Sequence, residues 1–229
     1  MARKVSILGA SGMIGGLLLD CLLEDNYYEE VHLLLRRALG STDPRVTEHL
    51  VDFADPKAYA PAISGSEAVF SCIGTTMKQV KGDREAYRKI DFDINRIAAE
   101  TAASYGVFAY LLVSSVGADP ANNNNFYLKL KGVTEETVSK QAIPQVHIFR
   151  PSLLVGDRKE SRPAEKISQF LAPAVSPLLL RGWRKYKPIK GLALAFAMMN
   201  AAKDPRRGIF IHEYDEIMSL ALKSGQYRA

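Results

Sequence analysis

A glycine-spaced turn that begins at Gly9 constrains the fold of this chain more than any other feature. The apolar residues 5–8 run directly into Gly9, and Gly12 and Gly15 follow before an apolar stretch with helical spacing. In such a strand–turn–helix unit, the first glycine permits the tight turn, the second lets the backbone approach a pyrophosphate, and the third lets the helix pack close to the strand. The helix then offers unpaired N–H groups to phosphates. The spacing predicts a dinucleotide-binding turn, with a plain glycine-rich turn as the alternative. The expected cofactor contacts here are Gly9, Ser11, Gly12, Met13, Ile14 and Gly15.

Apolar runs alternate with helical segments through the first two thirds of the chain. The predicted strands are residues 5–8, 31–35, 48–51, 68–73, 107–113 and 146–149, and the predicted helices are residues 13–23, a helix opened by Asp55 and Pro56, 85–105 and 126–139. This alternation predicts an α/β fold, a doubly wound parallel sheet of the Rossmann-like kind.

The pattern changes after Pro151, where prolines break the chain into short pieces. Two further helices are predicted at residues 192–202 and 213–223, and the polar tract 122–125 is read as a mobile loop. We expect a nucleotide-binding core over residues 1–155 and a small lobe over residues 156–229. The lobe would cover the carboxyl edge of the sheet within one structural domain.

The end of the second predicted strand indicates which dinucleotide is bound. An acidic residue at this place bonds the 2′-hydroxyl of NAD, whereas arginine accommodates a 2′-phosphate. Arg36 and Arg37 stand 21 and 22 residues after Gly15, with no acid beside them, and the forked donors of arginine suit a phosphate. The pair predicts NADP(H) as the cofactor, with an exposed arginine pair as the alternative.

A Tyr-x-x-x-Lys spacing places a phenol and an ammonium on one face of a helix, where the cation helps the phenol act as an acid or base. The chain holds two such pairs, Tyr127 with Lys131 and Tyr186 with Lys190, and Pro188 interrupts the second. The first pair follows a strand that ends in Ser114-Ser115, and a serine hydroxyl can polarise a substrate carbonyl. Hydroxyl, phenol and cation together suit hydride transfer to a carbonyl. A packing tyrosine beside a solvated lysine is the alternative.

At these residues the chain resembles the short-chain dehydrogenase/reductase superfamily, over most of its length. The runs at residues 125–132, 149–151 and 157–163 resemble the Tat-interactive protein 2 group of its atypical members. The resemblance implies a catalytic triad of Ser115, Tyr127 and Lys131, and the usual spacing of the family favours Ser115 over Ser114. It also implies that Tyr127 and Lys131 contact the cofactor.

The resemblance assigns further cofactor contacts to segments that follow predicted strands. They are Asp52 and Phe53 beside the adenine, Cys72, Gly74 and Thr75 in a cofactor-lining turn, and Arg150, Pro151 and Leu153 beside the nicotinamide. Residues 91–95 resemble the start of the central helix of the family, where an asparagine holds a water molecule near the lysine.

Two functions of different classes remain open at this point. The first is an NADP(H)-dependent oxidoreductase in which hydride passes between the nicotinamide and a small carbonyl compound or alcohol. The second is a non-catalytic NADP(H)-binding regulator that engages a protein partner through the basic last third of the chain. The fold alone does not decide between them, because this sheet serves many functions, but the predicted Ser-Tyr-Lys triad favours the oxidoreductase.

The charge is uneven along the chain. Residues 1–150 carry 16 Lys and Arg against 18 Asp and Glu, whereas residues 151–229 carry 14 against 7. A basic segment fits an anionic substrate or partner, or a solvated face. It contains Trp183 and Tyr186 but no recognised nucleic-acid motif, so no nucleic-acid partner is expected. We expect a small-molecule substrate, with an anionic one left open, and a monomer or a dimer.

Cysteine and histidine usage bears on metal sites and compartment. Two cysteines cannot form a disulfide framework, and the four histidines lack zinc spacing, so no metal is expected. No apolar run reaches the roughly 18 residues of a membrane span. Arg3 and Lys4 precede an apolar stretch that imitates a signal peptide, but glycines interrupt it. These features predict a cytoplasmic protein.

Overall fold

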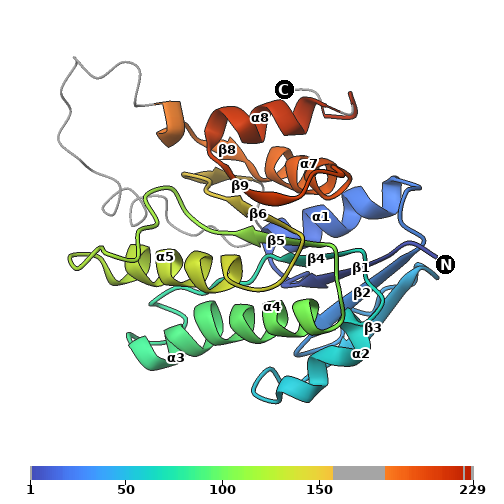
Figure 1. Cartoon of the computed structure of the whole chain (residues 1–229), viewed down its shortest axis with the longest axis horizontal. Coiled ribbons are helices and arrows are strands. Elements are labelled where there is room, and N and C mark those ends of the chain that lie inside the picture. Colours follow the sequence, from blue (N-terminus) through green and yellow to red (C-terminus); the bar gives the residue numbers. More distant parts are fainter. Residues whose placement is uncertain (1, 157–183, 224, 228–229) are drawn as a thin grey trace.

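A seven-stranded, fully parallel sheet forms the centre of the molecule (Figure 1). The computed structural model describes residues 2–156, 184–223 and 225–227. The strand order is β3-β2-β1-β4-β5-β6-β9. The strands are β1 (Lys4–Leu8), β2 (Glu30–Leu35), β3 (Val46–Leu50), β4 (Ala68–Ser71), β5 (Ala109–Val113), β6 (Gln145–Phe149) and β9 (Gly208–His212).

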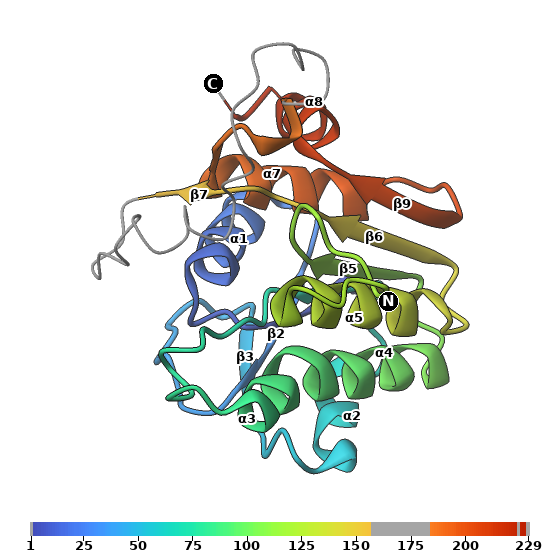
Figure 2. The same cartoon turned by 90° about the vertical axis from the view of Figure 1, so that its left-hand side faces the viewer.

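Helices cover both faces of this sheet, as both views show (Figures 1 and 2). On one face α1 (Met13–Glu24) and α7 (Gly191–Ala202) pack on the strands, with α8 (Tyr214–Leu222) against α7. On the other face lie η1 (Pro56–Tyr59), α2 (Ala60–Ile63), α4 (Ile94–Ser104) and α5 (Phe126–Ser139). Because both faces are covered, the central strands read as continuous apolar runs. The predicted doubly wound α/β fold is confirmed.

The edge strand β9 was not predicted. It pairs in parallel with β6, and Ile209 and Ile211 are about half exposed on it. The apolar run Ile209-Phe210-Ile211 was the available signal for this strand. The described part of the predicted lobe therefore lies within the main body. A separate small parallel pair joins β7 (Leu154–Val155), at the end of the predicted core, to β8 (Ile189–Lys190), in the predicted lobe.

The predicted continuous helix over residues 85–105 is interrupted. It consists of α3 (Arg84–Arg88), the π-helical turn η2 (Lys89–Asp93) and α4. A π turn widens the helix and leaves backbone groups without their usual partners. Here the side-chain amide of Asn95 donates to the carbonyl oxygen of Asp91 at 2.8 Å, which stabilises the turn.

The asparagine tract 122–125 is organised rather than a plain loop. The side-chain oxygen of Asn125 accepts from the backbone N–H of Leu128 at 3.2 Å and caps α5. The side-chain oxygen of Asn122 accepts from the N–H groups of Asn124 and Asn125. Asparagine favours such turns and caps, so the tract fixes where α5 begins.

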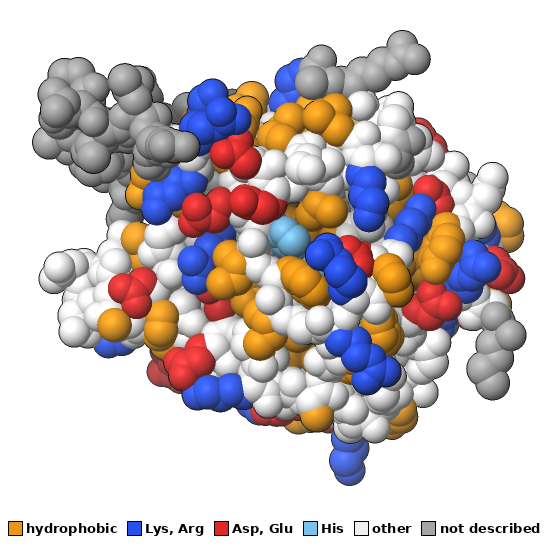
Figure 3. Space-filling view, turned by 45° about the horizontal axis from the view of Figure 1, so that its top comes forward, with side chains coloured by type: hydrophobic (Ala, Val, Ile, Leu, Met, Phe, Trp, Pro, Cys, Tyr) orange, Lys and Arg blue, Asp and Glu red, His pale blue; other side chains and the backbone are white. Residues whose placement is uncertain are grey.

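Basic and acidic side chains are interspersed over the face that carries α7 and α8 (Figure 3). Within the described ranges, Lys203, Arg206 and Arg184 each pair with an aspartate at 2.6–2.7 Å. Much of the basic excess, with Trp183 and the run 157–163, falls outside the described residues. No helix in the described ranges is both long and apolar enough to cross a bilayer.

Candidate functional site

A cleft of 1810 Å³ opens at the carboxyl edge of the sheet. Its floor lies where β1 and β4 are neighbours and the strand order reverses, which is where open α/β sheets bind ligands. Many of the predicted cofactor contacts line it: Gly9, Ser11, Gly12, Met13, Arg36, Arg37, Phe53, Cys72, Gly74 and Thr75. The fold therefore brings these predicted residues, which follow four different strands, to one cleft.

The glycine turn has the geometry that its spacing predicts. Gly9 has a φ of +85°, and a Cβ atom there would lie 2.7 Å from the carbonyl oxygen of Cys72. A Cβ atom on Gly15 would lie 2.2 Å from the carbonyl oxygen of Gly9, so α1 touches the turn through its backbone. Gly12 caps α1 without a side-chain bond, and the first turn holds no acid. The N-terminus of α1 therefore lies along the cleft with its positive dipole end, which is the kind of place where proteins bind anions.

Arg36 and Arg37 follow β2 and are exposed along the same cleft. Within the described ranges, neither lies within ion-pair distance of a carboxylate. The loop beyond them is held by Glu48, whose carboxylate accepts from the N–H groups of Leu39 at 3.0 Å and Ser41 at 2.8 Å. At one end of the cleft, two exposed cations thus have no carboxylate partner among the residues that the structure describes.

A second group of charges is buried behind the cleft. The carboxylate of Glu135, on α5, accepts from the Ser114 hydroxyl and from the Arg150 guanidinium, whose Nη2 lies 2.5 Å away. The adjacent Ser115 donates its hydroxyl to the backbone oxygen of Val116 over a long 3.4 Å. Among the described residues, the Ser114 hydroxyl is thus held by a carboxylate, whereas that of Ser115 has this weak contact alone.

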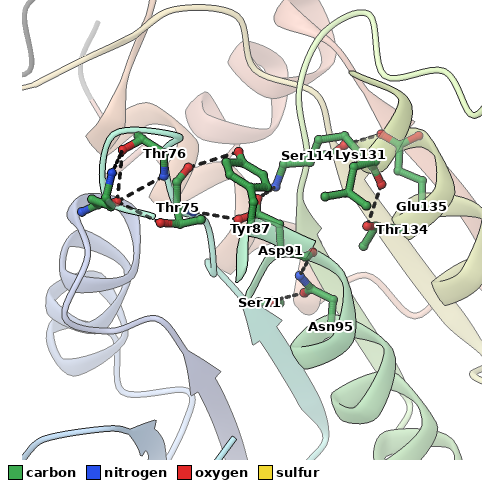
Figure 4. A network of polar contacts seen from close by, with 12 residues as sticks. Ser71, Thr75, Thr76, Tyr87, Asp91, Asn95, Ser114, Lys131, Thr134 and Glu135 are labelled. Carbon is green, nitrogen blue, oxygen red and sulfur yellow. Dashed lines mark hydrogen bonds and ion pairs between the residues drawn. The ribbon is translucent and has the colours of Figure 1, made fainter. Parts of the chain in front are cut away.

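Lys131 is buried on α5, and its Nζ lies 3.0 Å from Oδ1 of Asp91 (Figure 4). Oδ2 of the same carboxylate accepts from the backbone N–H of Thr75 at 2.8 Å, in the turn after β4. Burial disfavours the charged ammonium, but Asp91, with smaller contributions from Tyr127 and Glu135, raises the pKa of Lys131 above its ordinary value. Asp91 therefore links α5 to a turn that lines the cleft.

The loop between β5 and α5 is held tightly against α5. A Cβ atom on Gly132 would lie 2.2 Å from the backbone nitrogen of Pro120, and the N–H of Val116 donates to the carbonyl of Pro151 at 3.0 Å. Tyr127 is half-buried and packs edge-on against Tyr87, with ring centroids 6.5 Å apart. The predicted serine loop and the Tyr-Lys pair thus belong to one packed unit.

Several predicted site residues do not line the cleft: Ile14, Gly15, Asp52, Ser115, Tyr127, Lys131, Arg150, Pro151 and Leu153. Of these, Asp52 accepts a hydrogen bond from the N–H of Ala54. The second Tyr-Lys pair is not on a helical face, because Tyr186 ends the 3₁₀ helix η3 (Arg184–Tyr186) and Lys190 lies in β8.

In the segment 91–95, the side chain that lies next to Lys131 is a carboxylate rather than an asparagine. The Asn95 side chain is fully buried and bonds Ser71 and the Asp91 carbonyl, so the group that meets Lys131 is Asp91. Sequence reasoning also missed Glu135. Its position four residues after Lys131 on one helical face was the available signal.

A family model described as NAD(P)H-binding matches residues 9–168 of the chain. The chain belongs to the NAD(P)H-binding family. It is 34% identical to protein HTATIP2 of Rattus norvegicus over 90% of this chain and 84% of that protein, which confirms the resemblance to the Tat-interactive protein 2 group. It is 31% identical to protein fmp52, mitochondrial, of Emericella nidulans, over 86% of this chain and 88% of that protein.

Solved structures agree on the fold of this NAD(P)H-binding protein. The dTDP-glucose 4,6-dehydratase DesIV of Streptomyces venezuelae, with NAD bound, has a TM-score of 0.70 at 16% identity, covering 98% of this chain and 81% of that one. The Bordetella bronchiseptica enzyme WbmH in complex with NAD⁺ has a TM-score of 0.68 at 18% identity, covering 93% and 75%. At this identity the likeness shows the fold alone.

The expected cytoplasmic location is contradicted by the relatives. The fungal proteins of Emericella nidulans and Debaryomyces hansenii, at 31% and 34% identity, are both named as mitochondrial. The expectation rested on cysteine usage and on the lack of a long apolar run. Neither feature distinguishes the cytoplasm from the interior of an organelle.

Proposed function

We propose that this protein is an NADP(H)-dependent oxidoreductase of the short-chain dehydrogenase type, acting on a small carbonyl compound or alcohol. The observation that carries the proposal is the linkage Lys131–Asp91–Thr75. It attaches the Tyr-Lys pair of α5 to a turn that lines the nucleotide cleft. A cation fixed between a phenol-bearing helix and a dinucleotide cleft suits proton transfer beside a hydride donor.

The cleft residues support NADP(H) rather than NAD(H). The glycine turn and the N-terminus of α1 would hold the pyrophosphate, and Phe53 would lie beside the adenine. Arg36 and Arg37 would hold the 2′-phosphate, because they are exposed cations with no protein anion within the described ranges. Arginine donors match phosphate oxygens in pairs.

The side chains behind the cleft would transfer the proton, hold the cofactor ribose and bind the carbonyl oxygen. Bound NADPH would supply the hydride to the carbonyl carbon. The Tyr127 phenol would give its proton to the carbonyl oxygen, Lys131 would hold the cofactor ribose, and the Ser115 hydroxyl would bond that oxygen. Ser115 suits this role better than Ser114, because Ser114 already donates its hydroxyl to Glu135.

The test combines binding with turnover. NADPH and NADH are titrated into the protein by nucleotide fluorescence, and NADPH oxidation is followed over a panel of aldehydes and ketones. We expect NADPH to bind more tightly than NADH. Tyr127→Phe should lower turnover by about 100-fold or more while leaving NADPH affinity within about twofold. Undiminished turnover in this variant contradicts the catalytic role, and tight binding without turnover on any compound favours the regulator instead.

A further inference from the structure

Asp91 occupies an unusual place for a carboxylate. Its side chain is 1% exposed, and it projects from the π turn η2 at the point where an uninterrupted α-helix was predicted. Oδ1 forms an ion pair with the ammonium of Lys131 at 3.0 Å, and Oδ2 accepts a hydrogen bond from the N–H of Thr75 at 2.8 Å (Figure 4). π turns of this kind are frequent at functional sites.

Stability alone does not account for this pair. A buried ion pair seldom stabilises a fold more than apolar residues of the same volume would, because both charges lose their hydration. The pair does achieve two other things. It keeps a fully buried lysine charged, and it fixes the distance between α5 and the turn after β4. The charged or titratable groups that act on Lys131 are Asp91, Tyr127 and Glu135, and Glu135 is itself held by Arg150.

We propose that Asp91 is a positioning residue that holds the Lys131 ammonium as a fixed charge against the cofactor-lining turn. This inference rests on the proposed function, in which Lys131 contacts the nucleotide. Without Asp91, burial would dominate, and Lys131 would release its proton at a lower pH. The contact between Lys131 and the nucleotide would then weaken as the pH rises.

The experiment measures NADPH affinity by fluorescence titration between pH 6.5 and 9.5 for the wild type and Asp91→Asn. Asn keeps an oxygen acceptor for the Thr75 N–H, but it removes the charge and turns an NH2 donor toward Lys131 in place of Oδ1, which also favours the neutral amine. The phosphates of NADPH titrate equally in both titrations, so they cancel in the ratio of the two dissociation constants. We expect this ratio to rise by about tenfold or more across the range, the order of one lost charged hydrogen bond.

Four further variants separate positioning from a merely structural role. Asp91→Glu retains a carboxylate and should give a ratio with little pH trend. Lys131→Met should weaken binding equally at every pH. The double variant Asp91→Asn with Lys131→Met leaves no buried unpaired charge and should behave as Lys131→Met alone. Glu136→Gln removes an exposed carboxylate from the same helix and should match the wild type.

The outcomes are distinguishable. If the wild type binds NADPH and the Asp91→Asn ratio stays flat, the positioning role is overturned and the proposed function stands. If the wild type binds no nicotinamide nucleotide, the proposed function fails and this inference fails with it. If Asp91→Asn does not fold, the double variant decides. Binding much weaker than that of Lys131→Met shows that Asp91 acts on something other than Lys131, and this also overturns the role.

Discussion

The two sets of cations in this protein have opposite surroundings. Arg36 and Arg37 stand exposed along the cleft, with no carboxylate in reach among the described residues. Lys131 and Arg150 lie behind it, and each is held by a buried carboxylate, Asp91 or Glu135. The two sets differ in their partners: over the described ranges the first set has no carboxylate partner, and the second has one built into the fold.

This difference separates affinity from stability. An exposed charge contributes little to the free energy of unfolding, because water solvates it in both the folded and the unfolded state. Removing Arg36 or Arg37 should therefore weaken ligand binding and leave the free energy of unfolding almost unchanged. A buried cation that loses its carboxylate becomes an uncompensated charge in a poorly hydrated place. Variants of the buried pairs should therefore have a lower free energy of unfolding even in the absence of a ligand.

The largest effect is expected for Glu135→Gln. This change leaves Arg150 without its counter-ion and Ser114 with a weaker acceptor. The free energy of unfolding should fall by about 3 kcal/mol, measured by urea denaturation. The next residue supplies the control: Glu136 pairs with Lys140 in solvent, and Glu136→Gln should stay within about 0.5 kcal/mol of the wild type. Equal losses in both variants would show that the buried network adds nothing.

The double variant Arg36→Ala with Arg37→Ala should have the reverse profile. NADPH affinity should fall by about 100-fold, because two charged hydrogen bonds to the 2′-phosphate are lost. NADH lacks this phosphate, so its affinity should change little, and the unfolding midpoint in urea should not move. A similar loss for both nucleotides would place the 2′-phosphate elsewhere.

The contrast between the two sets also explains what the sequence could predict. The glycine turn, Arg36 and Arg37 act through local patterns at strand ends, and they do line one cleft. The inner network depends on pairs far apart in sequence, such as Asp91 with Lys131 and Glu135 with Arg150. A carboxylate within an amphipathic helical pattern rich in charges does not reveal which distant cation it meets. The π turn that presents Asp91 was equally hidden, because its composition is that of an ordinary helix.

The glycine turn at the open end of the cleft brings backbone, rather than charged side chains, close together. A Cβ atom on Gly15 would lie 2.2 Å from the carbonyl oxygen of Gly9, whereas one on Gly16 would lie 3.4 Å from its nearest neighbour. Gly15→Ala should lower the free energy of unfolding by about 1–3 kcal/mol, because α1 must move off the turn. It should also weaken NADPH binding.

The adjacent Gly16→Ala serves as the control. Alanine fits there in ordinary contact, and within a helix it should add up to about 1 kcal/mol. Both variants are measured by urea denaturation, with NADPH titration of the folded protein. Indistinguishable results for the two positions would mean that α1 does not depend on close contact with the turn.

The smallest effect concerns a buried titratable group that has no carboxylate bonded to it. His147 Nδ1 lies 2.8 Å from His212 Nε2 between β6 and β9. Burial, followed by His212 and offset in part by Asp204, lowers the pKa of His147 to about 3, and burial lowers that of His212 to about 4. Both are therefore neutral in the folded protein at neutral pH, in contrast to Lys131, which stays charged beside Asp91.

The sign of the pH effect follows from these lowered pKa values. Above the ordinary histidine pKa of about 6.5, both states are neutral and the stability is complete. As the pH falls below that value, the unfolded chain binds protons that the folded protein refuses, so stability declines until the folded pKa values are reached. Between pH 7 and pH 6 the pair should lower the free energy of unfolding by about 1 kcal/mol.

Urea denaturation of the wild type and of the double variant His147→Gln with His212→Gln checks this. The free energy of unfolding should depend less steeply on pH in the variant. An unchanged slope would assign the acid sensitivity to His32 and His49, whose pKa values burial also lowers.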